Sequence, residues 1–166
     1  MSRTQGLVAA GQQDPQPDPP GTIDGSVNPE LIPDAVAYGL LFLAVAEPEN
    51  PTSEQRARAW AKISAAGLTE TDFEALLLVL GKLHQEIGII NARLNQIRDH
   101  GSLDDPSSPD VALAIQLGMQ FNKLLAETTT ILPTRLSRDG IERLHSHLQN
   151  AKRGMKVLPD TMMIPK

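Results

Sequence analysis

The feature that most constrains the fold is a stripe of apolar residues between Thr69 and Gly101. Its members recur in uninterrupted steps of three and four: Phe73, Leu76, Leu80, Leu83, Ile87, Ile90, Leu94 and Ile97. This period places all of them on one face of a single α-helix. With a rise of about 1.5 Å per residue, the helix would be about 45 Å long. So long a stripe predicts that other helices cover it.

Start and stop signals predict four further helices around this segment. They run from Pro33 to Ala46, from Thr52 to Gly67, from Ser108 to Pro133, and from Ser137 to about Met155. Thr, Ser and Pro are favoured where helices begin, and Gly where they end. No strand is predicted, and aromatic residues make up only 3% of the chain. The predicted fold class is all-α, an antiparallel bundle of about five helices with one long central helix.

Three regions are expected along the chain. Residues 1–27 are predicted as a disordered, proline-rich tail, residues 28–158 as the helical bundle, and residues 159–166 as a C-terminal tail. Within the last tail, Met162, Met163 and Ile164 are candidates for docking on the bundle. The core is expected to contain Leu40, Leu43, Trp60, Ile63, Leu76, Leu80, Leu83, Ile87, Leu117, Phe121, Leu124, Leu144 and Leu148.

Composition excludes several classes of function. The chain has no cysteine, which rules out disulfides, thiolate catalysis and cysteine-based zinc sites. Its net charge of -5 does not favour nucleic-acid binding. The first turn of the long helix is acidic, at Glu70, Asp72 and Glu74, unlike a DNA-recognition helix. No transmembrane segment is predicted, because the longest apolar run, 35–46, is shorter than the roughly 20 residues needed.

We also find no complete catalytic or metal-binding motif in the sequence. A dinuclear metal bundle needs two Glu-x-x-His motifs, and only Glu142 with His145 has that spacing. His145 and His147 are two apart and would point to different sides of a helix. We find no nucleotide-binding or nucleophile motif. We therefore expect no cofactor and lean against an enzyme, with a metal-binding bundle as a distant third possibility.

Three surfaces are candidates for interactions. The far half of the long helix is a candidate interface if it extends beyond its neighbours: Ile87, Ile90, Leu94 and Ile97. The proline-flanked lead-in to the first helix is a candidate recognition surface: Glu30, Asp34 and Tyr38. The last helix ends in a candidate basic patch for an anionic partner, although cations there also suit the helix dipole: Lys152, Arg153 and Lys156.

The segment Asn28-Pro-Glu-Leu-Ile-Pro-Asp34, with Asp24-Gly25 and the stretch Leu136-Ser137…Leu144, resembles an uncharacterised group of exported bacterial helical proteins. The resemblance implies an exported location, so a periplasmic or secreted protein is favoured over a cytoplasmic one. It implies no activity. Leu7–Gly11 fits either the end of a signal peptide or part of a disordered tail.

Two functions follow as hypotheses. The first is a non-enzymatic helical interaction or structural module that binds a protein partner or a second copy. The second is a bundle that binds a small apolar ligand in a cavity between the first, third and fourth helices. The second is motivated by small residues on the helix faces: Gly39, Ala44, Gly81, Gly88, Ala114 and Gly118.

Overall fold

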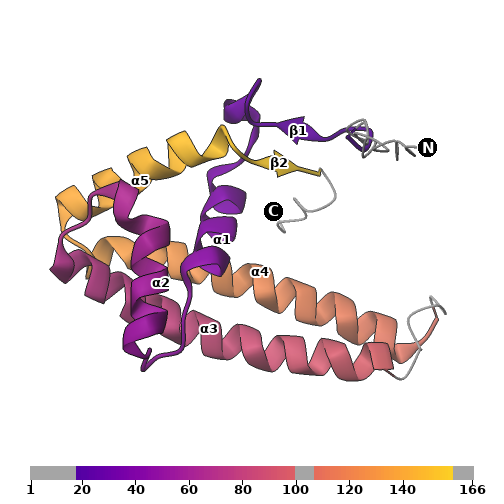
Figure 1. Cartoon of the computed structure of the whole chain (residues 1–166). Helices are drawn as coiled ribbons and strands as arrows, with labels where there is room; N and C mark the ends of the chain where they lie inside the picture. The colour runs from indigo at the N-terminus through magenta and orange to yellow at the C-terminus, as the bar shows by residue number, and fades with distance from the viewer. Residues whose placement is uncertain (1–17, 100–106, 159–166) are drawn as a thin grey trace, which may run out of the picture.

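Figure 1 shows a computed structural model of the chain, which describes residues 18–99 and 107–158. The elements in order are β1 (Ile23–Asp24), the 3-10 turn η1 (Pro29–Leu31), α1 (Asp34–Val45), α2 (Ser53–Ile63), the 3-10 turn η2 (Ser64–Ala66), α3 (Glu70–Asp99), α4 (Pro109–Arg135), α5 (Arg138–Lys152) and β2 (Lys156–Val157). The predicted all-α class is confirmed.

The two long helices, α3 and α4, lie side by side and antiparallel, as predicted for chain neighbours (Figure 1). The other three helices gather around the N-terminal half of α3, where α1 and α2 cross the long pair instead of running along it (Figure 1). The far half of the α3–α4 pair extends away from them (Figure 1). The molecule is therefore a helical cluster with a two-helix arm.

Local start signals are confirmed in the structure. Thr52 and Gln55 form a capping box, with bonds of 2.8 Å from Thr52 N to Gln55 Oε1 and 3.2 Å from Gln55 N to Thr52 Oγ1. Ser108 and Ser137 cap α4 and α5 through their hydroxyl oxygens. The predicted end at Pro133 is wrong, since α4 continues to Arg135. A proline in the last turn removes only one backbone donor, and the helix ends two residues later.

Three predicted core residues lie at the surface. Leu40 is 43% exposed, Leu43 44% and Trp60 39%. Trp60 packs edge-on against Phe73 at the side of α2, with ring centroids 4.8 Å apart. α1 is apolar on all sides, but its neighbours bury only Ala37, Tyr38, Gly39, Leu41, Phe42 and Val45. The opposite apolar face of α1 is left uncovered.

The expected boundary of the N-terminal tail and the expected absence of strands are corrected by a short antiparallel pair. β1 pairs with β2, so that Ile23 faces Val157 and Asp24 faces Lys156. Gly25 continues this contact, and its N–H donates to Met155 O at 2.9 Å. A Cβ at Gly25 would lie only 1.8 Å from Lys152 O, so this close approach requires glycine. The rest of the predicted tail, residues 1–17, and the C-terminal residues 159–166 lie outside the described residues.

Candidate functional site

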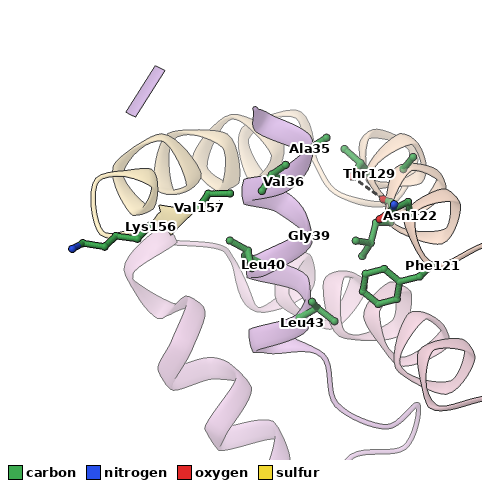
Figure 2. A pocket seen from close by; sticks show the side chains of 12 residues that line it. Ala35, Val36, Gly39, Leu40, Leu43, Phe121, Asn122, Thr129, Lys156 and Val157 are labelled. Atoms are coloured by element: carbon green, nitrogen blue, oxygen red, sulfur yellow. Dashed lines mark hydrogen bonds between the residues drawn. The ribbon is translucent and has the colours of Figure 1, made fainter. Parts of the chain in front are cut away.

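An apolar groove lies between α1 and α4, and residues of β2 also line it (Figure 2). Its cavity volume is about 260 Å³. We call it the α1/α4 groove. α1 contributes Val36, Gly39, Leu40 and Leu43, and β2 contributes Lys156 and Val157. The lining from α4 includes Phe121, Asn122, Leu125 and Thr129.

α1 and α4 approach each other closely at Gly39, where a Cβ would lie 3.0 Å from Cδ1 of Leu125. Beside this contact the side chains of Leu43 and Phe121 lie on the two sides of the groove (Figure 2). The Thr129 hydroxyl donates to Leu125 O at 3.0 Å, a bond back to the carbonyl of the preceding helical turn. That hydroxyl is engaged within the helix.

The groove offers apolar surface and almost no reactive chemistry. Among the described residues that line it there is no carboxylate and no histidine. Its one cation, Lys156, bonds to Asp18 at 2.6 Å, and this hydrogen bond raises the pKa of the Lys156 ammonium. Such a lining can exclude water from an apolar side chain.

The two helices that form the groove carry long runs without charge. Neither 35–46 on α1 nor 111–122 on α4 contains an acidic or basic residue. On α4, Ile115 is 61% exposed and Met119 is 52% exposed. These two and Asn122 recur at steps of four and three, so the uncharged exposed surface continues along α4 from the groove. An exposed apolar surface of this extent is typical of interaction sites.

The candidate interface on α3 is covered within the chain. Ile87, Ile90 and Ile97 are buried and Leu94 is partly buried. Ile90 and Ile97 form a separate small core with Leu117 of α4. The expected exposure of this stripe is therefore wrong, because α4 is nearly as long as α3 and runs beside its far half. Binding through these side chains would require the two helices to separate.

The candidate recognition surface is not one surface. Glu30 is exposed on η1, but Tyr38 is buried against Phe42, with ring centroids 5.5 Å apart. Asp34 accepts hydrogen bonds from Lys152 and, at 3.0 Å, from Gln149. The bonds from Lys152 and then Gln149 lower the pKa of the Asp34 carboxyl. These two hydrogen bonds therefore link Asp34 of α1 to α5.

The candidate basic patch is also divided. The Lys152 side chain is buried and bonded to Asp34. Lys156 is exposed and pairs with Asp18, while Arg153 is exposed at the end of α5. An anionic partner would meet only part of the predicted positive charge.

A buried carboxylate joins the starts of α3 and α5. Asp72 accepts hydrogen bonds from Ser137 N at 2.7 Å, Ser137 Oγ at 2.8 Å and Thr69 Oγ1 at 2.8 Å. Burial raises the pKa of Asp72, but the bonds from Ser137 and Thr69 outweigh it and hold the pKa below its usual value of 3.8. The sequence shows the two capping signals but not that they share one carboxylate. Both carboxylate oxygens accept hydrogen bonds from residues at helix starts, which gives Asp72 a structural role.

The predicted cavity between three helices is replaced by the α1/α4 groove, to which α3 contributes no lining residue. Gly39 lines it as a small residue. Gly81 instead lets the loop after α1 pass close by, since a Cβ there would lie 2.7 Å from Cα of Glu49. A Cβ at Gly88 or Gly118 would meet nothing within 4 Å.

No metal site is found in the described part of the chain, where no group of three or more His, Cys, Asp or Glu side chains is placed to hold an ion. Glu142 pairs with Arg138 at 3.1 Å, and His145 lies 3.3 Å from Gln149, both on the exposed side of α5. No helix within residues 18–99 and 107–158 is long and apolar enough to cross a membrane.

Comparison with protein-family models, with curated proteins and with solved structures finds no match. The resemblance of the 28–34 segment to exported bacterial proteins stays a prediction. The groove is interpreted below from its own geometry.

Proposed function

We propose that this protein is a non-enzymatic interaction module that holds an apolar segment of another polypeptide in the α1/α4 groove. One observation carries the proposal. Leu40 and Leu43 are 43% and 44% exposed beside a cavity of about 260 Å³, on a helix that has no charge over residues 35–46. Cores of protein interfaces are depleted of charge in the same way.

The shape of the groove favours a polypeptide as its ligand. Small-molecule pockets usually enclose most of their ligand in roughly 300–1,000 Å³. This groove is smaller and continues into the exposed α4 surface at Ile115 and Met119. An elongated, largely apolar surface of this kind suits side chains at regular spacing along a helix or an extended peptide. Full burial of a leucine side chain contributes about 1.5–3 kcal/mol, so Leu40 and Leu43 each have roughly 1 kcal/mol left to gain.

The proposal is tested with matched charge substitutions. Leu43→Asp places a carboxylate in the groove, whereas Leu78→Asp changes a leucine of α3 that is 52% exposed and does not line it. A protein recovered with the wild type and Leu78→Asp but not with Leu43→Asp is purified, and its dissociation constant is measured. We expect binding to the wild type and Leu78→Asp to agree, and binding to Leu43→Asp to be about tenfold weaker or more. Equal affinity for all three proteins would contradict the proposal.

A small apolar ligand is the second candidate, favoured by the apolar lining of the cavity of about 260 Å³. Native mass spectrometry distinguishes it. An added mass that stays on the wild-type monomer and is lost from Leu43→Asp would support this candidate in place of the first.

A further inference from the structure

We infer that the chain's own segment Met162–Ile164 occupies the α1/α4 groove and competes there with the partner. The inference rests on the proposed function, because it assigns an occupant to the same groove. Residues 159–166 lie outside the described residues, so the inference is argued from the groove and from the point where the described chain ends.

The described chain ends at the edge of the groove. Lys156 and Val157 form β2 and also line the cavity (Figure 2). Their position is fixed by pairing with Ile23 and Asp24, and by the bond from Gly25 N to Met155 O. The next residue, Leu158, is 42% exposed. The following segment therefore starts beside the groove whichever way it turns.

The segment is long enough to cross the groove. Met163 follows Val157 by six residues, which span about 20 Å when extended. Along α1, the lining residues run from Ala35 to Leu43, a rise of about 12 Å. Pro159 also restricts Leu158 to extended conformations, which favours the longer reach.

The chemistry of the segment matches the groove. Met162, Met163 and Ile164 are three consecutive apolar residues. Methionine side chains are flexible and fill irregular apolar spaces. A short tether also gives the segment a local concentration of about millimolar, so even weak contacts compete with a partner in solution.

The direct test uses the absence of cysteine from the natural chain. We pair Met163→Cys with Leu43→Cys in the groove, and in a control with Leu78→Cys, which lies in a separate hollow on another side of the α3–α4 pair. A disulfide needs Cβ atoms about 3.5–4.5 Å apart. In one glutathione buffer, we expect the groove pair to oxidise about tenfold faster than the control pair. Rates that agree within about twofold would overturn the inference.

Two further measurements keep the result interpretable. Circular dichroism of the reduced variants checks folding, and Leu40→Cys replaces Leu43→Cys if the latter does not fold. In the otherwise natural chain, Met163→Asp should bind the purified partner about tenfold more tightly, because the competing segment is weakened. Unchanged affinity would overturn the inference. If the disulfide and affinity tests fail while Leu43→Asp still weakens partner binding about tenfold or more, this inference is wrong and the proposed function is still supported.

Discussion

At the scale of single residues, Asp72 is the side chain on which the most local structure depends. Its carboxylate binds Ser137 and Thr69, and a Cβ at Gly140 would lie only 2.6 Å from its Cγ. We predict that Asp72→Ala lowers the free energy of unfolding by about 1–3 kcal/mol, because the donors of Thr69 and Ser137 at the two helix starts lose their buried acceptor. Urea unfolding at neutral pH measures this. Asp139→Ala, an exposed carboxylate in the first turn of α5, is the control and should cost about 1 kcal/mol or less.

The contribution of Asp72 should also depend on pH. Its pKa in the folded protein lies below the usual 3.8, so the folded state favours the ionised form. The stabilisation is fully present above the unfolded pKa and is lost as the pH falls through the folded pKa. We predict that the stability difference between the wild type and Asp72→Asn shrinks between about pH 5 and pH 2. A difference that stays constant over this range would show that the charge of Asp72 does not contribute.

Single residues also show where sequence reasoning succeeds. The caps at Thr52, Ser108 and Ser137 were predictable because a cap acts within three residues of its own position. The bond from Ser137 to Asp72 spans 65 residues of sequence, and no local pattern encodes it. Asp34 was singled out as a surface group, but its partner Lys152 comes from the other end of the chain.

At the scale of elements, alanine substitution at two glycines of α3 should change the free energy of unfolding in opposite directions. Gly81→Ala should lower the free energy of unfolding by about 1–3 kcal/mol, because its Cβ would lie 2.7 Å from the Glu49 backbone. Gly88→Ala should raise it by about 0.5–1 kcal/mol, because its Cβ meets open space and alanine favours the helix. Thermal and urea unfolding of the two variants measure both changes. Equal effects would mean that the loop after α1 does not pack on α3 as described.

The two-helix arm depends on its own small core. Ile90 is 2% exposed and packs with Leu117, whereas its neighbour Ile89 is 46% exposed. We predict that Ile90→Glu destabilises the arm by about 3 kcal/mol or more, while Ile89→Glu stays within about 0.5 kcal/mol. Amide hydrogen exchange checks this at 88–99 and 109–120, where protection should fall only in Ile90→Glu. Loss of protection in both variants would contradict the assigned faces of α3.

The apolar pattern of α3 predicted that another helix packs against its apolar face, but not which helix does so. A period of three and four specifies one buried face, and α4 carries a matching stripe. α1 is apolar on all sides, so its sequence specifies no face. Because α1 is apolar on all sides, Leu40 and Leu43 were wrongly predicted to lie in the core. For the same reason, the groove beside them was not predicted. The uncharged runs at 35–46 and 111–122 are the sequence signal that would have indicated it.

At the scale of the whole molecule, both ends of the described chain meet beside the groove. β1 and β2 pair next to the start of α1, and β2 lines the groove. The fold therefore presents one largely apolar surface over α1 and the middle of α4, with β2 beside it. The all-α class followed from the sequence, whereas this convergence depends on contacts between residues more than a hundred positions apart.

The most direct test of the central claim, that the α1/α4 groove holds an apolar polypeptide segment, is photo-cross-linking from inside it. A photoreactive residue replaces Leu43, and in the control it replaces Leu78. Peptide mapping of the products by mass spectrometry identifies what each position touches. We predict that position 43 gives a defined cross-link to an apolar segment, of a partner or of residues 162–164, and that position 78 does not. Products at position 43 that are no more defined than those at position 78 would contradict the claim.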